Sequence, residues 1–384
     1  MSLNALAIES HYGGSHKAFL DSWIAKSQHQ WKVLSLPAAN WKSRIRHSAY
    51  HFAAAIDRLE QPFDILFCSD LINLAELKAF AGSTLANIPI VLYFHENQFS
   101  YPVQPPNQID QHLAFHNLTS ATVADMIWWN SSFNQRQFLD SVQDYTQRFH
   151  DYDFSSYLED VESKSIVFPP GIDLVAPART ENKVPVICWA ARWENDKAPH
   201  TFFKAMRILA EDGFKFKINV MGEQGDYTPD CFASAQDSLK SHIQRWGYQP
   251  SRDAYLKGLA ESDFFVSTAV HEFFGMSVVE AILCGAYPVL PQRLAYPEVM
   301  QLNKHPERSE HFYQGGAPAL ARHLSQLLER YNQGSLWESP QENLLSSFEK
   351  YRMSTCSIAM DQQLIDLAGN EKQESQQADH RQNG

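Results

Sequence analysis

The stretch from Glu272 to Glu280 carries two carboxylates around a Gly-Met-Ser turn. An apolar segment ends at Ser267 before it, and a second one ends at Gly285 after it, so this order predicts a strand, a loop and a helix beginning at Gly275. Backbone N–H groups at a helix start favour an anion such as a diphosphate. The two carboxylates could then reach opposite ends of a nucleotide sugar. Taken alone, they could equally be surface groups that flank a turn.

Two cations, Arg192 and Lys197, follow the apolar run 186–190. This order places both on a turn between a strand and a helix, where the helix dipole disfavours positive charge. A bound diphosphate would remove that conflict, because Arg grips it with two hydrogen bonds and Lys acts as a point charge. The alternative is a solvated cation pair. With the paired carboxylates downstream, the pattern favours a site that stabilises a leaving nucleoside diphosphate without a metal.

These two pairs resemble the signature of retaining GT-B glycosyltransferases of family 4. The segments 9–17, 93–98, 192–197 and 271–275 narrow the resemblance to the group that contains tRNA-queuosine α-mannosyltransferase. The resemblance covers nearly the whole chain. It implies an α/β fold of the GT-B type, with two doubly wound Rossmann-like parallel-sheet domains facing a central cleft. It also implies a retaining hexosyltransferase with a GDP-mannose donor and, as acceptor, queuosine in a tRNA anticodon loop.

The resemblance also assigns roles to residues. Glu272 would bind hydroxyls of the donor sugar and Glu280 would bind the ribose. Arg192 and Lys197 would stabilise the departing diphosphate, and His95 would lie beside the anomeric centre. The other donor contacts that we expect are Gly13, Gly14, Phe274, Gly275 and Met276.

The segment after the apolar run 90–94 is polar and contains His95, Glu96 and Asn97. A lone histidine is more often a satisfied core residue, but such a polar cluster would be hard to bury, which favours a site. The resemblance implies that Glu96 and Asn97 face the acceptor. His11, His16 and His271 do not fall at metal-ligand spacing, so we expect no metal.

The pair Gly13-Gly14 follows the first apolar run. Glycines there would allow the backbone to approach a ligand closely, since they carry no Cβ. A plain tight turn is the alternative.

A basic stretch opens the helical pattern that begins at Trp41. Lys42, Arg44 and Arg46 crowd its first turns. A solvated helix end accounts for such a run as well as an anion-facing patch does. The patch could contact tRNA phosphates or, through peripheral membrane contact, anionic lipid head groups.

The chain has 384 residues, which suits two domains. We expect an N-terminal domain over residues 1–172, a C-terminal domain over 185–345 and a proline-containing linker between them. Helices over 346–367 would pack back on the first domain, as the resemblance implies. Residues 368–384 are polar and without periodicity, so a disordered tail is expected.

Short apolar runs alternate with longer helical stretches along both halves, which predicts parallel sheets whose ligand sites lie at the carboxyl ends of the strands. The expected strands are Leu3–Ile8, Val33–Leu36, Ile65–Cys68, Ile90–Phe94, Met126–Trp129, Ile166–Val167, Val186–Ala190, Phe216–Met221, Ile243–Trp246, Phe264–Ser267 and Tyr287–Leu290.

Composition narrows the class of protein further. The formal net charge of −12 argues against a surface coated for nucleic-acid binding. No apolar run is long enough to span a membrane, and the N-terminus does not resemble a signal peptide. The five scattered cysteines fit reduced core thiols in a cytoplasmic protein. The remaining alternatives are a glycosyltransferase acting on a lipid-linked or glycan acceptor, a GT-B sugar-nucleotide epimerase and a non-catalytic nucleotide-sugar-binding protein.

Overall fold

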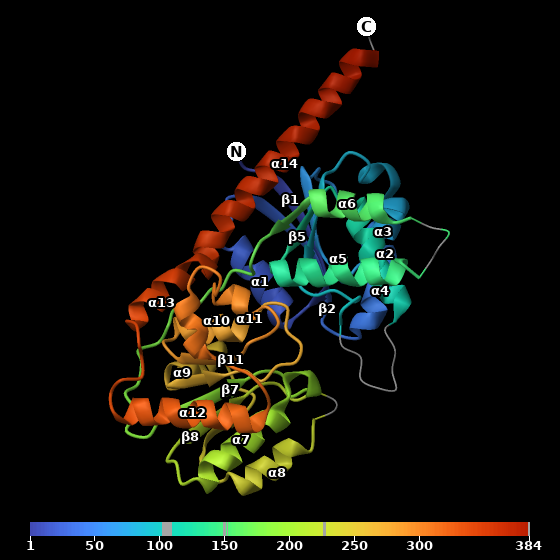
Figure 1. The fold of residues 1–384 in the computed structure, drawn as a ribbon. Coiled ribbons are helices and arrows are strands. Elements are labelled where there is room, and N and C mark those ends of the chain that lie inside the picture. Colours follow the sequence, from blue (N-terminus) through green and yellow to red (C-terminus); the bar gives the residue numbers. More distant parts are fainter. Residues whose placement is uncertain (102–109, 149–150, 152, 226–227, 383–384) are drawn as a thin grey trace. The chain divides into compact units, whose positions relative to one another are not determined.

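The chain forms two compact units in the computed structural model, which describes residues 1–101, 110–148, 151, 153–225 and 228–382 (Figure 1). One unit comprises Met1–Asp173 with Tyr351–Gly384, and the other comprises Leu174–Lys350. The boundary between the two units therefore lies between Asp173 and Leu174, so most of the expected linker belongs to the second unit. Asn182 explains the difference, because its Nδ2 donates to Oδ2 of Asp263 at 2.9 Å and so ties the linker to the second unit.

The first unit contains a six-stranded parallel sheet in the order β2-β1-β3-β4-β5-β6. Apolar runs buried on both faces make β1, β3, β4 and β5 strands of a covered sheet, whereas β2 and β6 lie at its edges and are partly exposed. The strands are β1 (Asn4–Tyr12), β2 (Gln30–Pro37), β3 (Ile65–Ser69), β4 (Ile90–Phe94), β5 (Met126–Trp129) and β6 (Ser165–Val167).

Helices cover both faces of this sheet. One face packs against α2 (Trp41–Ile56), α3 (Leu74–Ala81), α4 (Gln111–Val123), α5 (Ser132–Thr146) and α6 (Ser155–Ser163). The other face packs against α1 (Gly14–Ile24) and α14 (Met353–Gln382). A 3-10 turn at Gly82–Thr84 follows α3.

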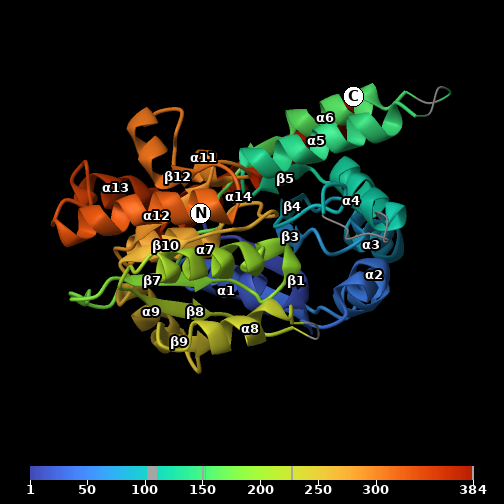
Figure 2. The same ribbon diagram turned by 60° about the horizontal axis from the view of Figure 1, so that its bottom comes forward.

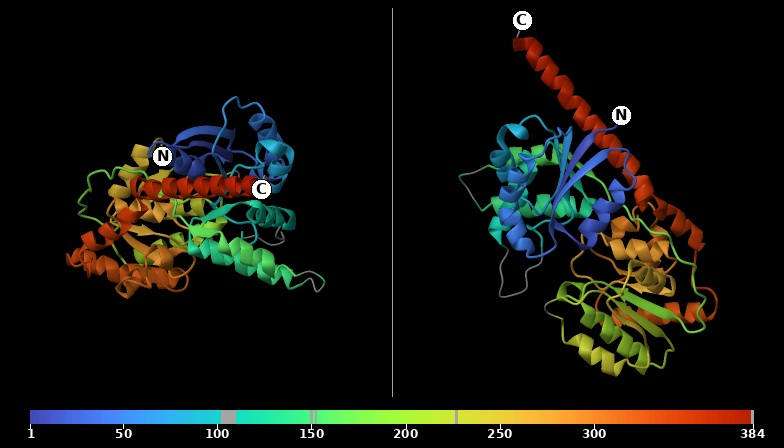
Figure 3. Two further views of the ribbon diagram at one scale, coloured as in Figure 1. Left: turned by 90° about the horizontal axis from the view of Figure 1, so that it is seen from above. Right: turned by 180° about the vertical axis from the view of Figure 1, so that it is seen from behind.

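Helix α14 brings the end of the chain back to the N-terminal unit, where it runs beside α1 and β1 (Figure 3). Met353, Met360 and Leu364 are buried in the core of that face. Asp361 is buried too, and its Oδ1 accepts a hydrogen bond from Nε1 of Trp23 at 2.8 Å. Its Oδ2 accepts one from the backbone N–H of Gln28 at 2.7 Å. This carboxylate therefore anchors the last helix.

The expected disordered tail is helical as far as the structure describes it, because α14 continues to Gln382. After Gly369 the chain is rich in Gln and Glu and contains no proline, and such residues favour a helix. The helix propensity of these residues explains why the segment is helical although its sequence has no apolar periodicity.

The second unit contains another six-stranded parallel sheet, in the order β12-β11-β10-β7-β8-β9. Each expected strand is present in this unit, and the two-residue strand β12 was not foreseen because it is too short to show a pattern. The strands are β7 (Val186–Ala190), β8 (Lys217–Met221), β9 (Ile243–Gly247), β10 (Phe264–Val266), β11 (Tyr287–Pro291) and β12 (Phe312–Tyr313).

The helices of the second unit also pack on its sheet. One face lies under α7 (Pro199–Glu211), α8 (Cys231–Ser238) and α12 (Ala317–Asn332) (Figure 2). Helix α10 (Met276–Leu283) packs on β10 and β11 and contacts α9 (Arg252–Ala260) and α13 (Gln341–Phe348). The remaining short elements are 3-10 turns at Asn195–Lys197, Pro306–His311 and Glu349–Tyr351 and helix α11 (Tyr296–Val299). Two doubly wound parallel sheets confirm the predicted fold class.

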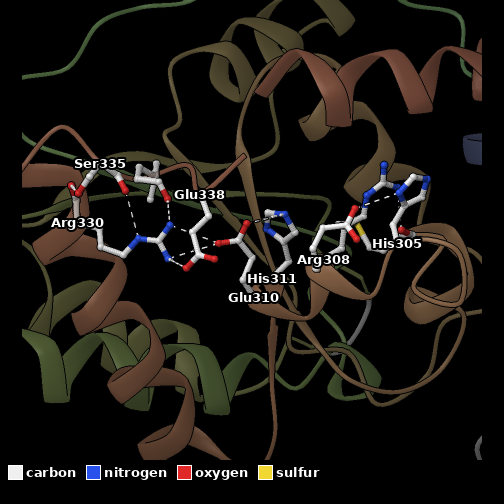
Figure 4. Close-up of polar contacts among 10 residues, drawn as sticks. His305, Arg308, Glu310, His311, Arg330, Ser335 and Glu338 are labelled. Atoms are coloured by element: carbon white, nitrogen blue, oxygen red, sulfur yellow. Dashed lines mark hydrogen bonds and ion pairs between the residues drawn. The ribbon is translucent and has the colours of Figure 1, made fainter. Parts of the chain in front are cut away.

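The amino edge of the second sheet is held by side-chain pairs. Near the end of α12, Nη1 of Arg330 lies 2.9 Å from Oε1 of Glu338, and its Nη2 lies 3.3 Å from Oε2 of Glu310 (Figure 4). Nη1 of Arg308 donates to the carbonyl of Met300 at 2.9 Å. These contacts fix the 3-10 turn before β12, away from the carboxyl edge where sites form.

Replacing Asp361 by alanine should destabilise the first unit. Trp23 Nε1 and the Gln28 N–H would lose their acceptor, and unpaired buried donors cost about 1–3 kcal/mol each. We expect a lower Tm by calorimetry than for Gln362→Ala, which changes an exposed residue of the same helix. Equal melting of the two variants would show that the anchor is unimportant.

Candidate functional site

The loops that follow β7 and β10 meet at the carboxyl edge of the second sheet, and Lys197 joins them. Its Nζ donates to the carbonyl of His271 at 2.8 Å and lies 3.1 Å from Oδ2 of Asp196. Oε2 of Glu272 lies 3.5 Å away. The backbone N–H of Val270 donates to the Asp196 carbonyl at 2.8 Å, so the main chains of the two loops are also bonded. Two of the predicted donor-binding residues, far apart in sequence, are thus brought together.

The charge state of this cluster follows from its surroundings. Burial lowers the pKa of the Lys197 ammonium, but the carboxylates of Glu272 and Asp196 outweigh that effect and raise it. Burial and the nearby Lys197 charge lower the pKa of His271 to about 4. Lys197 is therefore a cation and His271 a neutral imidazole at neutral pH.

Arg192 occupies a different environment from Lys197. More than half of its side chain is exposed, and its Nη1 lies 3.3 Å from Oε1 of Glu194. It is close enough to Lys197 for its charge to lower the pKa of that residue. The sequence grouped the two cations as equals, whereas the structure makes Lys197 a buried support and Arg192 a surface-facing charge.

The helix start at Gly275 is built as the sequence predicts. Gly275 has φ of 101°, which favours glycine, and a Cβ there would lie 2.9 Å from the ring of Tyr296. Helix α10 begins at the next residue, Met276, which is partly exposed. A small hollow adjoins this start and is lined by Lys197, Glu272, Ser277 and Tyr296 among others.

The side chains of Glu280 and Phe274 are more buried than residues that bind a donor were expected to be. Glu280 is buried, and its Oε1 forms an ion pair with Nη2 of Arg252 at 2.5 Å. Its Oε2 accepts from the hydroxyl of Tyr255 at 2.9 Å. Both oxygens are thus held by α9, and a ribose would have to share or displace these contacts. The Phe274 side chain is 3 % exposed and packs in the interior, so it offers a ligand no free face.

The predicted glycine pair of the first unit divides into two roles. Gly13 is extended, and a Cβ on it would lie 2.3 Å from the Cβ of Ala38, so this glycine allows the turn after β1 to pack on the chain after β2. Gly14 has φ of 53°, and a Cβ added there would meet no atom of the described residues within 4 Å. Gly13 is needed for packing, and Gly14 for the backbone turn that starts α1.

His95 lies at the carboxyl end of β4 in a cluster that the sequence did not reveal. Its ring centroid is 4.0 Å from that of His16. Nδ1 of His16 lies 3.2 Å from Oε2 of Glu9, and both of these side chains are buried. Asp70, also fully buried, accepts the His95 N–H through Oδ1 at 2.9 Å. Burial raises the pKa of Asp70 to about 8, against the lowering effect of His16.

Glu9, His16 and His95 could together hold a metal ion, because one ligand atom of each lies within 4.8 Å of the others. The direct contact between Glu9 and His16 already accounts for this proximity, since it is a hydrogen-bonded ion pair. We therefore describe the three as a charge cluster. The spacing along the sequence gave no sign of it, because Glu9 belongs to β1, His16 to α1 and His95 to the loop after β4.

Asn97 is not placed to contact an acceptor, which corrects the prediction. It is fully buried, its Nδ2 donates to Oδ1 of Asn134 at 2.8 Å, and its Oδ1 accepts from the backbone N–H of Ser100 at 2.9 Å. Amide pairs of this kind let a polar loop be buried at low cost. Its neighbour Glu96 is only partly buried and accepts from Nε2 of Gln98 at 3.2 Å.

The basic stretch lies in the first turns of α2, as predicted. Lys42 is exposed and its Nζ lies 5.5 Å from the ring centre of Trp41. Arg44 donates to the carbonyl of Pro37 at 3.4 Å. Arg46 forms an ion pair with Asp110, so part of its charge is already neutralised.

Comparison with known proteins places this site in a family. Residues 4–172 match the model of the tRNA-queuosine alpha-mannosyltransferase N-terminal region, and residues 174–342 match glycosyl transferases group 1. The tRNA-queuosine alpha-mannosyltransferase of Drosophila melanogaster is 37% identical over 308 residues, which cover 77% of this chain and 81% of that protein. The chain belongs to the tRNA-queuosine alpha-mannosyltransferase family. This membership confirms the resemblance on which the site assignments rest.

Solved structures confirm the GT-B fold of this family member. Anabaena HepE in complex with UDP aligns with a TM-score of 0.65 and 14% identity, covering 95% of this chain and 100% of that one. The catalytic domain of starch synthase IV from Arabidopsis thaliana, bound to ADP and acarbose, aligns with a TM-score of 0.68 and 12% identity, covering 97% and 99%. Among the residues described, none of the helices is long and apolar enough to cross a membrane.

Replacing Lys197 by alanine should lower the thermal stability of the protein far more than replacing Arg192 by alanine. In Lys197→Ala, Asp196 and Glu272 lose their partner, and breaking a buried ion pair costs about 3–5 kcal/mol. We expect a clearly lower Tm for that variant, and no change for Arg192→Ala or for the exposed control Lys204→Ala. Equal Tm values for all three would refute the supporting role of Lys197.

Proposed function

We propose that this protein transfers mannose from GDP-mannose to queuosine in a tRNA anticodon loop, with retention of anomeric configuration. Membership of the tRNA-queuosine alpha-mannosyltransferase family carries the proposal, because the matching relative acts by name on tRNA queuosine and covers most of the chain. A tRNA substrate and five free cysteines are both consistent with action in the cytoplasm.

The donor would bind at the start of α10 and the loop after β7. Arg192, the exposed cation, would contact the diphosphate, and the buried Lys197 would add a second positive charge. Glu272, next to Lys197, would orient the sugar hydroxyls, and Glu280 would take the ribose in exchange for one of its α9 partners. Two cations fixed before the reaction can stabilise developing phosphate charge, so the proposed reaction needs no metal cofactor.

Retention would follow from attack on the face of the leaving group. The acceptor hydroxyl oxygen forms a bond to the anomeric carbon while the bond from that carbon to the phosphate oxygen breaks. The proton of the hydroxyl passes to the departing phosphate oxygen, so no protein side chain has to act as the base. This proton transfer needs no general base, and the proposed donor-binding residues are charged groups suited to the diphosphate and the sugar.

The protein should add a hexose to queuosine in isolated tRNA when GDP-mannose is supplied, as measured by mass spectrometry of the nucleosides. Arg192→Ala should lower kcat about 10²–10³-fold, as for the loss of one charge-stabilising group. EDTA should leave the rate unchanged, and tRNA that lacks queuosine should gain nothing. Loss of all turnover with EDTA, or hexose transfer only to lipid acceptors, would contradict the proposal.

Charge reversal at the first turns of α2 should weaken tRNA binding. Each lost phosphate contact reduces the slope of log K against log salt by about 1. Arg44→Glu should have the larger effect, because Arg46 is already paired with Asp110. Lys215→Glu, at an exposed site of the second unit, is the control. Unchanged binding would exclude the patch, and flotation with anionic liposomes would assign it to a membrane.

A further inference from the structure

Side chains of neighbouring elements hold the main chain of residues 267–272, which follow β10 and carry Glu272 at their end. We call this segment the Glu272 loop. Four of its carbonyl oxygens accept a hydrogen bond from a side chain. The donors are the hydroxyl of Tyr313 to Ser267 at 2.9 Å, Nη2 of Arg293 to Thr268 at 3.2 Å, Nε of Arg293 to Ala269 at 3.0 Å and Nζ of Lys197 to His271 at 2.8 Å. Contacts within the second unit alone therefore define the conformation of the loop.

Arg293 provides two of these four hydrogen bonds. Its Nε and Nη2 share one edge of the planar guanidinium group, so they can bind the carbonyls of two consecutive residues at once. The side chain lies at the surface, and within the part of the chain that the structure describes it forms no ion pair with a carboxylate. Its hydrogen bonds go to the loop rather than to an acid.

The two cations that hold the loop come from opposite sides of it. In the sheet, β10 lies between β11 and β7. Lys197 follows β7 and binds the loop at the carbonyl of His271, whereas Arg293 follows β11 and binds two earlier carbonyls. Each cation thus fixes a different part of the loop, and both parts bear on where the Glu272 carboxylate lies.

A strained turn brings Arg293 to the loop. Leu294 has φ of 61°, in the left-handed region that few residues other than glycine adopt. The backbone N–H of Arg293 donates to the carbonyl of Pro291 at 2.7 Å, so the chain turns directly after β11. Strain of this kind persists where the surrounding contacts require one backbone conformation. The turn therefore points to a demand on the position of Arg293.

Tyr296, three residues after Arg293, supports the loop a second time. Its buried hydroxyl lies 2.7 Å from Oγ of Ser267, the first residue of the loop. Its ring packs against Gly275, where a Cβ would lie 2.9 Å from it. The segment after β11 thus contacts the chain on both sides of Glu272.

We propose that Arg293 is a positioning residue, which holds the Glu272 loop so that the carboxylate of Glu272 is in place before the sugar of the donor binds. The role of Glu272 toward the sugar rests on the proposed function, whereas the bracing of the loop rests on the contacts of Arg293. Arg293 need not touch the donor, since it acts through the main chain of the loop. A group that is fixed in advance needs no ordering during the reaction, which lowers the barrier.

The direct test is amide hydrogen exchange of the full-length protein without donor. In Arg293→Ala two carbonyls lose their donor, so the amides of residues 267–272 should exchange about tenfold faster than in the wild type. Arg293→Lys has no planar fork and should give an intermediate rate. Arg322→Ala, at an exposed site of α12, is the control and should match the wild type. Equal exchange in Arg293→Ala and the wild type would overturn the proposal.

The kinetic test separates the position of Glu272 from the binding of the nucleotide. GDP carries no sugar, so Arg293→Ala should bind GDP with the Kd of the wild type. Its kcat for hexose transfer should fall about 10²-fold, as expected for a small misplacement of a catalytic group. Arg293→Lys should recover part of that loss. A general structural defect would instead weaken GDP binding and lower the Tm together with kcat, and that result would refute the positioning role, as would a kcat equal to that of the wild type.

Tyr296→Phe gives a second variant should Arg293→Ala fail to fold. It keeps the ring against Gly275 and removes only the hydroxyl that meets Ser267. The same amides should exchange faster in this variant, and unchanged exchange in both Tyr296→Phe and Arg293→Lys would refute the bracing of the loop from this side.

The outcomes distinguish this inference from the proposed function. If the exchange rates agree but the wild type transfers no hexose, the proposed function fails and the bracing of the loop stands. If the wild type transfers hexose and neither exchange nor kcat depends on Arg293, the proposed function stands and the role of Arg293 is wrong.

Discussion

The buried ammonium of Lys197 is the interaction on which the second unit's site depends. It satisfies the carbonyl of His271 and lies between the carboxylates of Asp196 and Glu272, so it joins the loop after β7 to the loop after β10. Two loops that leave neighbouring strands of a parallel sheet would otherwise repel each other through their acidic side chains. With the cation in place, Glu272 is held at the carboxyl edge, close to the start of α10. The same charge that builds the site would then be available to a diphosphate.

The first unit also has an ion pair near the carboxyl ends of its strands, formed by Glu9 and His16. Glu9, at the end of β1, is buried next to His16 in the first turn of α1, and His95 lies against that histidine at the end of β4. In both units an acid and a base form an ion pair at the carboxyl edge. Glu9 and His16 are both buried, whereas the buried Lys197 lies beside the partly buried carboxylates of Asp196 and Glu272. Such pairs contribute little net stability, because desolvation offsets attraction. Their value lies in fixing a geometry before a ligand arrives.

The sequence predicted the fold well because its apolar runs are short, β-rich and regularly separated. All strands longer than two residues in the described part of the chain were foreseen, and Gly275 indicated the start of α10, which begins at the next residue. Side-chain partners from distant elements could not be foreseen. Glu280 meets Arg252 and Tyr255, and Asn97 meets Asn134, only because the folded chain brings their helices and loops together. Position relative to a strand end is local information, whereas burial of a polar group is decided by tertiary packing.

In the proposed function, the charges around Lys197 receive the diphosphate of the donor. The most direct measurement is a crystal structure of the protein with GDP bound. We expect phosphate oxygens within about 3 Å of Arg192 and of Lys197, with the ribose hydroxyls on Glu280 in place of Arg252 or Tyr255. A nucleotide bound elsewhere, or one that leaves the ion pair of Glu280 and Arg252 intact and lies far from Lys197, would contradict it.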